Sequence, residues 1–158
     1  LRALVAAHPE TIRVLRAAGE PPTVYDIELG CRGAEAPGAP TPRLRDRHVV
    51  RVRLPAGYPI KRPTVEVLTP VWNPHVFSNG MVCLGGEWSP GQGLDLFVRR
   101  LWRILVWDPA VIDPGSPADD AAMDWYEANA DLVPFDRPAP DDAGAPPASD
   151  RSRIAWNG

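Results

Sequence analysis

The chain has 158 residues, of which 44% are hydrophobic and 23% charged, and this fits one folded domain with its own core. A formal net charge of −3 argues against a polybasic surface, so neither nucleic acid nor a membrane is predicted as a partner. No apolar run approaches the roughly 20 residues that span a bilayer, and no signal peptide is visible. Two cysteines without a CxxC pair fit neither a disulfide framework nor a structural zinc site, so we expect no metal and a reducing cytoplasm.

The first 19 residues favour helix. Pro9 interrupts this segment, so we expect one helix that ends near His8 and a second helix that begins there. Gly19 and the two prolines that follow it then stop helical structure.

The middle of the chain alternates apolar and polar residues, which is typical of half-buried strands. Residues 33–42 are rich in glycine and proline and are expected to form a loop. Short turns between the alternating segments make an antiparallel meander the simplest topology. The expected strands are residues 23–31, 47–54 and 64–68, with a short fourth strand at 81–84.

From Leu94 the apolar residues recur at helical spacing, and this helix is expected to end before Asp108 and Pro109. A second, shorter helix is expected to begin after Ser116 as N-cap, with Pro117 in its first position. It should run to about residue 129.

Residues 134–150 hold too few large apolar side chains to build a core. We therefore predict a domain at 1–133 and a flexible tail, rich in proline and aspartate, at 134–158. The segment 151–156 carries two large apolar side chains and is a candidate to dock back on the domain.

Cys83 stands at the end of a short apolar run, between turn residues on both sides. Reactive cysteines are often placed in this way. The alternative is a buried cysteine that only packs in the core. Cys31, which lies in strand-like sequence without any motif, is interpreted as such a core residue.

Short motifs on both sides of Cys83 resemble the ubiquitin-conjugating (E2) family over roughly residues 23–129. They occur in the family's order: YPIKRP at 58–63, NPH at 73–75, SNG at 78–80, CL at 83–84, WSP at 88–90 and DPAVIDP at 108–114. The resemblance implies a UBC-like fold of the α+β class. Its expected elements are an N-terminal helix, a four-stranded antiparallel meander, the cysteine segment, a long central helix and a shorter C-terminal helix.

Lys61 is the only lysine among 17 basic residues. A GC-rich genome explains this preference for arginine, and so does a protein that keeps amines away from its own electrophilic intermediate. The short domain and the arginine-rich composition resemble a bacterial member of the family. In bacteria the family implies E1-like and deubiquitinase-like partners and a role in antiviral defence.

The resemblance also implies a chemistry that needs no cofactor. Cys83 would accept ubiquitin or a ubiquitin-like protein from an activating enzyme (E1) as a thioester and pass it to an amine of a target protein. His75 stands where the family has an asparagine, so it is a candidate to stabilise the oxyanion; the alternative is a residue that packs a loop. Asp113 matches the acid that orients or deprotonates the incoming amine; the alternative is a turn aspartate.

Three further residues are predicted to support the active site. Asn73 replaces the first histidine of the family motif, whose role is mainly structural. Asn79 is expected to shape the turn before the cysteine segment. Trp88 is expected to belong to the core or to cover the active-site segment.

Ile60, Ser89 and Pro90 match the loops that eukaryotic members use to bind E3 ligases. A bacterial protein need not have an E3 partner, so these three residues are treated as structural by default, and the use of an E3 stays open.

Two departures from the family pattern bear on specificity. The family commonly has an acid two residues after the cysteine, but here that position is Gly85, followed by Gly86. In addition, only four residues separate Cys83 from Trp88. We therefore expect a different groove beside the cysteine and a different preference for the acceptor.

Three functions are weighed: a conjugating enzyme, an inactive E2-variant scaffold that still binds a ubiquitin-like protein or an E1, and an RWD-like interaction domain. Inactive variants usually lack the cysteine, so Cys83 together with Asp113 in register favours the enzyme. An RWD-like domain has no reason to keep the segment from SNG to WSP.

Overall fold

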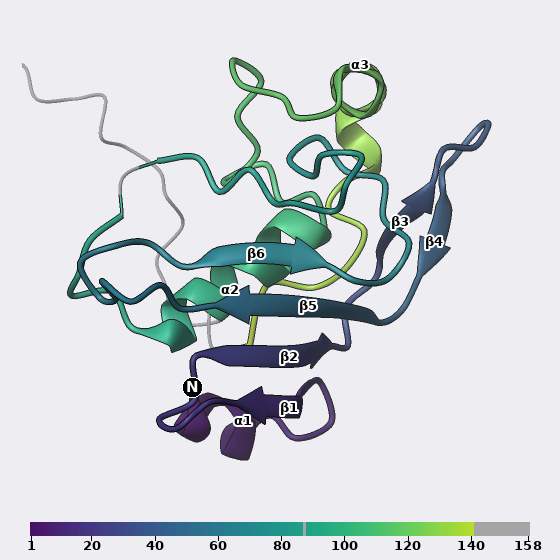
Figure 1. Cartoon of the computed structure of the whole chain (residues 1–158). Coiled ribbons are helices and arrows are strands. Elements are labelled where there is room, and N and C mark those ends of the chain that lie inside the picture. Colours follow the sequence, from purple (N-terminus) through teal and green to yellow (C-terminus); the bar gives the residue numbers. More distant parts are fainter. Residues whose placement is uncertain (87, 141–158) are drawn as a thin grey trace, which may run out of the picture.

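A four-stranded antiparallel sheet is the frame of this protein (Figure 1). The computed structural model describes residues 1–86 and 88–140. Along the sheet the strands follow the order β1 (Ile12–Ala18), β2 (Val24–Leu29), β5 (His48–Arg53) and β6 (Thr64–Val67). A short helix, α1 (Arg2–Ala7), precedes β1 at one edge of the sheet. The N-terminal helix, the four-stranded sheet and the α+β class are thereby confirmed.

Alternation along β5 separates the two faces of the sheet. Val50 and Val52 are buried, and Val50 pairs with Ile27 of β2. Between them, Arg51 points to the other face and binds Asp26 with two hydrogen bonds of 2.7 and 2.8 Å. Since successive residues of a strand face opposite ways, one face of the sheet is apolar and the other carries ion pairs.

The long central helix covers the apolar face, as predicted. Helix α2 (Leu94–Leu105) crosses behind β5 and β6 in Figure 1. Its buried residues recur at spacings of three and four, which places them on one side of a helix. They are Phe97, Val98, Leu101, Trp102, Ile104 and Leu105.

A second, smaller core follows α2. Trp107 is fully buried and has a φ of 62°, a left-handed backbone that is rare for bulky residues and turns the chain out of the helix. Helix α3 (Asp120–Ala128) and a 3₁₀ turn (Ala130–Leu132) close this core. We call it the aromatic cluster. Its rings are Trp72, Trp107, Trp125, Tyr126 and Phe135.

The expected second helix after Pro9 is wrong, because residues 12–18 form strand β1. Only Ile12 is buried among the seven residues of this strand. The strand therefore has no alternating apolar face that its sequence could reveal. Pairing with β2 gives the strand its partner, from Ile12 opposite Leu29 to Ala18 opposite Val24. Tertiary pairing here overrides a local preference for helix.

The expected loop at 33–42 begins with a strand. Strand β3 (Gly33–Ala36) pairs with β4 (Arg43–Arg45) as a separate two-stranded sheet. A side chain at Gly33 would meet the carbonyl oxygen of Leu105 at 2.5 Å, so the absence of one lets β3 pass closely over the end of α2.

Two boundaries also differ from expectation. Residues 81–84 form no strand: Met81 and Val82 each make a single bridge, to Glu66 and Val76, which is too little for a ladder. Helix α3 starts after Asp119, whose carboxylate accepts a hydrogen bond from the Ala122 amide at 2.9 Å. The expected cap at Ser116 is wrong, because residues 114–116 form a turn and a bend and the helix begins only at Asp120.

Residues 134–140, which the sequence assigns to the tail, pack on the domain. The Phe135 amide donates to the Val106 carbonyl at 2.9 Å, and Ala139 is buried in the main core. The predicted boundary after residue 133 therefore falls within packed chain. The rest of the predicted tail, including the segment 151–156, lies outside the described residues.

Candidate active site

Cys83 lies on the segment that follows β6 in the sheet. Val82 donates its amide to the Val65 carbonyl at 3.0 Å, and the Cys83 amide donates to the His75 carbonyl at 2.7 Å. Val82 and Leu84 are buried on either side, whereas Cys83 is partly exposed. The backbone of the cysteine is thus fixed while its thiol side is reachable. Cys31, by contrast, is fully buried, and burial raises the pKa of its thiol.

His75 connects Cys83 to the loop that carries Asp113. Besides the carbonyl that accepts from Cys83, its ring atom Nε2 accepts a hydrogen bond from the Asp113 amide at 2.8 Å. The ring is almost completely buried. One residue therefore holds two segments that lie 30 residues apart in the chain, which is the difference between 113 and 83.

The hydrogen bond fixes the state of this histidine. An Nε2 atom that accepts carries no proton, so the neutral ring has its proton on Nδ1. Burial lowers the pKa of His75 below its ordinary value of 6.5; Asp113 opposes this shift and Arg100 adds to it. Nδ1 is buried and has no hydrogen-bond partner among the described residues. The only N–H donor of the neutral ring therefore makes no hydrogen bond to the described residues.

Asn73 anchors the turn that carries His75 to helix α2. It is fully buried; its Oδ1 accepts from the His75 amide at 2.9 Å and its Nδ2 donates to the Ile104 carbonyl on α2 at 2.8 Å. It ties the turn that carries His75 to the end of the central helix.

The Asp113 side chain is exposed, at the rim of this arrangement. Its Oδ1 accepts from the Gly115 amide at 2.9 Å. Farther along, the amide of Ala118 donates to the Pro74 carbonyl at 2.7 Å, so the loop is attached to the same turn at two points. The structure thus brings Cys83, His75, Asn73 and Asp113 into one hydrogen-bonded unit.

The chain on the other side of Cys83 is held by arginines. Arg100, on α2, donates from Nε and Nη2 to the Leu84 carbonyl at 3.2 and 2.8 Å. Arg62 donates to the Gly85 carbonyl at 3.3 Å. Gly85 and Gly86 have φ values of 51° and 60°, which favour glycine over any other residue. This is where the predicted departure from the family pattern lies.

The remaining predicted residues lie farther from the thiol. The Oδ1 atom of Asn79 accepts from the Met81 amide at 3.0 Å, which shapes the turn before the cysteine segment. Trp88 donates to the Pro59 carbonyl at 2.6 Å, and its ring meets Phe97 edge-on at 5.8 Å. Trp88 therefore joins the turn at 58–59 to α2, while Ser89 and Pro90 are exposed. Ile60 is 78% exposed.

Sequence reasoning missed Arg62 and Arg100. Arg100 comes three residues after the buried Phe97, so it borders the apolar stripe of α2, and a charged residue at that margin was the available signal. Arg62 lies inside the YPIKRP motif and carries no signal of its own. Within residues 1–86 and 88–140, no helix is both long and apolar enough to cross a membrane.

The architecture and the part-exposed cysteine define an α+β domain of the UBC-like class. A family described as "Ubiquitin-conjugating enzyme" matches residues 38–134, more than half of the chain. The chain belongs to the ubiquitin-conjugating enzyme family.

Several relatives carry the same family name. Human ubiquitin-conjugating enzyme E2 K is 27% identical over 105 residues, which is 64% of this chain and 50% of the relative. Ubiquitin-conjugating enzyme E2 2 of Mycosarcoma maydis is 35% identical over 76 residues, 46% of this chain and 39% of the relative. The structure of human ubiquitin-conjugating enzyme E2 G1 matches with a TM-score of 0.49 and 18% identity, over 68% of this chain and 92% of that chain. The chain spans about half the length of the curated relatives it matches.

Proposed function

We propose that this protein is an E2-like conjugating enzyme with Cys83 as its nucleophile. The observation that carries the proposal is the pair of hydrogen bonds through His75, which hold a part-exposed cysteine and the loop of an exposed carboxylate in one unit. The partners are then an E1-like activating enzyme, a ubiquitin-like modifier and a target protein.

The reaction has two acyl transfers. In the first, the Cys83 thiolate attacks the C-terminal carbonyl of the modifier on the activating enzyme; a new carbon–sulfur bond forms and the activating enzyme's thiolate leaves. In the second, an amine of the target attacks this thioester, a carbon–nitrogen bond forms and the Cys83 thiolate leaves. The amine must lose a proton, and the exposed carboxylate of Asp113 is the group proposed to orient the amine and to accept that proton.

We assign His75 to positioning and to charge stabilisation. Its Nε2 is engaged by the Asp113 amide and its Nδ1–H is buried, so a direct contact with an oxyanion would require the ring to become accessible during the reaction. In the geometry described, His75 acts by positioning Cys83 and the Asp113 loop, and a donor that becomes accessible would add stabilisation of the charge in the transition state. His75→Ala is expected to slow transfer to an amine about 100-fold, while loading changes much less. Equal loss of both steps would assign His75 to structure alone.

The deciding experiment incubates the protein with ATP, an activating enzyme and a modifier that together load a reference E2. We expect an adduct that disappears on thiol treatment and is absent in Cys83→Ala. The matched control is Cys31→Ala, which removes the buried cysteine and should still load. If no adduct forms under conditions that load the reference E2, the protein is an inactive scaffold that binds a modifier or an E1.

Finer statements about this protein are proposals as well. They are a cytoplasmic location, a bacterial source, a role in antiviral defence, and a division into a UBC-like domain and a tail, with the boundary beyond the buried Ala139 in place of residue 133. Ile60, Ser89 and Pro90 are exposed, so we propose that they bind a partner such as an E3, with a structural role as the alternative. A pull-down with E3 domains that bind other E2 proteins distinguishes the two: binding that Ile60→Ala abolishes without loss of stability supports the partner surface, and no binding contradicts it.

A further inference from the structure

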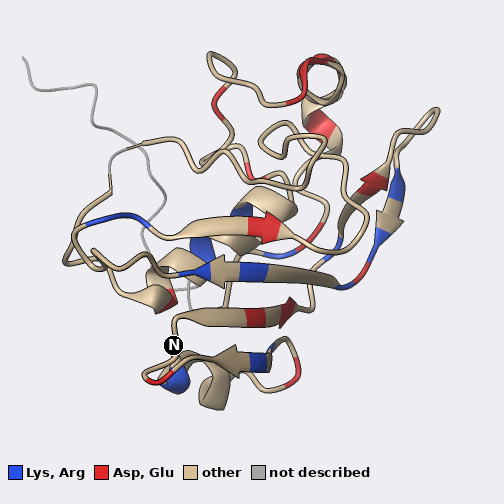
Figure 2. Cartoon of the chain, in the orientation of Figure 1, with Lys and Arg blue, Asp and Glu red and all other residues tan. Residues whose placement is uncertain are grey.

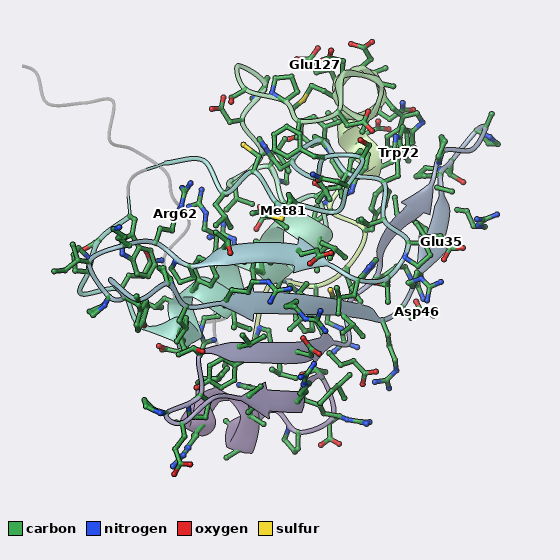
Figure 3. All side chains as sticks on the ribbon, viewed as in Figure 1. Glu35, Asp46, Arg62, Trp72, Met81 and Glu127 are labelled. Carbon is green, nitrogen blue, oxygen red and sulfur yellow. The ribbon has the colours of Figure 1, made fainter. Side chains whose placement is uncertain are left out.

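Two guanidinium groups flank the chain that leaves Cys83. Arg100 reaches it from α2 and Arg62 from the segment that leads into β6, where Figure 3 labels it. Both contact backbone carbonyls, those of Leu84 and Gly85. A guanidinium has five N–H donors, and these bonds use two atoms of Arg100 and one of Arg62. Donors remain free on both side chains.

No carboxylate pairs with Arg62 or Arg100 in the part of the chain that the structure describes. Burial lowers the pKa of Arg100, and the positive charges of Arg103 and Arg62 lower it further. Among the described residues, like charges therefore meet at Arg100. An anion bound between the two guanidinium groups would relieve this repulsion.

A small pocket lies at this place. It has a volume of about 20 Å³, enough for one water-sized group such as a single carboxylate oxygen. Its polar lining is made by the two arginines and Gln92, and its floor by Trp88 and Phe97. The carbonyls of Leu84 and Gly85 are already occupied by the arginines, so they do not repel an incoming anion at full strength.

We propose that Arg62 and Arg100 form an anion subsite beside Cys83, which takes the carboxylate of an acidic side chain on one of the two protein chains that meet at this cysteine. The inference deepens the proposed function and rests on it, because only a transfer reaction brings two protein chains to Cys83. It assigns a substrate preference to the segment in which this chain departs from its family.

Alkylation of Cys83 tests the subsite without any partner protein. Iodoacetate and iodoacetamide both form a carbon–sulfur bond with the thiolate and release iodide, but only iodoacetate carries a carboxylate. The ratio of their rates therefore measures the attraction of an anion to the thiol. Removing one positive charge should lower that ratio in Arg62→Gln, and charge reversal in Arg62→Glu should lower it further; in water, unit charges about 6 Å apart would give about threefold and about tenfold.

The controls separate this effect from general charge. Arg62→Lys should keep the ratio, and Arg16→Glu makes the same charge change on β1, at the opposite edge of the sheet. Cys31 is fully buried, and peptide mass spectrometry confirms that the modified residue is Cys83. If the ratio in Arg62→Glu falls no further than in Arg16→Glu, the subsite does not exist.

A second measurement identifies the chain that carries the carboxylate. A preloaded thioester is discharged onto lysine peptides that have Glu or Gln beside the lysine. If the acceptor supplies the carboxylate, the Glu peptide reacts faster, and Arg62→Gln lowers this preference for Glu over Gln by a larger factor than it lowers the rate of loading. If the modifier supplies it, Arg62→Gln slows loading instead. If neither step responds, the proposed ligand is wrong; if no thioester forms at all, the proposed function fails while the alkylation ratio still decides the subsite.

Discussion

The two sides of Cys83 are built in different ways. On the side of His75 and Asn73, buried polar groups join three segments through short hydrogen bonds. On the side of Gly85 and Arg62, the backbone is left-handed, the side chains are cationic, and the surface is more open. The first side is suited to holding a reaction geometry, and the second to selecting what approaches it.

This difference shows that the tightly hydrogen-bonded part and the open part of the candidate site lie on separate sides of Cys83. Buried polar networks are costly to alter, because a change leaves unpaired groups behind. An exposed arginine or a flexible glycine can change at little cost in stability. The following predictions test the contrast between a network side and an arginine side.

The largest effect is expected on the network side, at Asn73. Asn73→Ala removes two hydrogen bonds and leaves the His75 amide buried without a partner, whereas the Ile104 carbonyl keeps its bond from the Trp107 amide. The free energy of unfolding should fall by about 3 kcal/mol, measured by urea denaturation. The matched control is Asn79→Ala in an exposed turn, with an expected loss under about 1 kcal/mol. Similar losses in both variants would contradict a network anchored at Asn73.

The network side should also make stability depend on pH. Since burial lowers the pKa of folded His75 below 6.5, the unfolded chain takes up this proton first when the pH falls. The contribution is complete above about pH 6.5 and is lost as the pH falls through the folded pKa. Unfolding free energies between pH 7.5 and about 5 should therefore decrease, and less so in His75→Gln.

His48 provides the comparison for this titration. It is fully buried away from Cys83, and burial lowers its pKa to about 4. Its contribution to stability should also be lost as the pH falls. The free energy of unfolding of His75→Gln should therefore still decrease towards low pH, but less than in the wild type. A variant that titrates like the wild type would show that His75 is not the group responsible.

A smaller effect is expected on the arginine side, at Gly85. An added Cβ would have Arg100 Nη2 as its nearest neighbour at 3.8 Å, so Gly85→Ala meets no clash. Its cost is that of a left-handed backbone, about 1 kcal/mol. Gly91→Ala is the matched control, with φ outside the left-handed region and an expected change under about 0.5 kcal/mol. Equal denaturation midpoints would show that the backbone here is not strained.

The smallest effect should come from Ile60. This side chain is 78% exposed, so Ile60→Ala should change the free energy of unfolding by less than about 0.5 kcal/mol. A loss above about 1 kcal/mol would mean that the side chain packs in solution, and the arginine side would then be less open than the structure indicates.

The sequence allowed the cysteine, the central helix and the sheet to be predicted, because each has a local pattern. Strand β1 could not be predicted, since Ile12 alone is buried and only pairing with β2 decides its conformation. The close passage of Gly33 over α2 depends equally on contacts distant in the chain.

Within the candidate site, the sequence singled out residues but did not show how they are connected. His75 and Asp113 were found from motifs, but the bond between them spans 38 residues and joins a ring to a backbone amide, which no residue type reveals. Arg100 belongs to a helix whose sequence pattern indicates only packing against the sheet. Its contact with Leu84 exists only because α2 lies behind the cysteine segment.

The charges repeat the division of the molecule on a larger scale. In Figure 2 the helix α3 is marked by acidic residues, whereas basic residues lie on β5 and on the segment before β6. The acidic residues of α3 include Asp120, and those on its partner loop include Asp113. An approaching protein therefore meets opposite charges on the two sides of Cys83, which would orient it before contact.

The aromatic cluster provides a spectroscopic probe of one part of this molecule. Trp107 stands 5.6 Å from both Trp72 and Trp125, measured between ring centroids, and Figure 3 shows Trp72 close to α3. Indoles at this separation couple their electronic transitions and give a circular dichroism signal that isolated indoles lack. Trp88 and Trp102 lie with the other core. The loss of the coupled signal on heating would therefore report the detachment of α3 separately from the melting of the sheet.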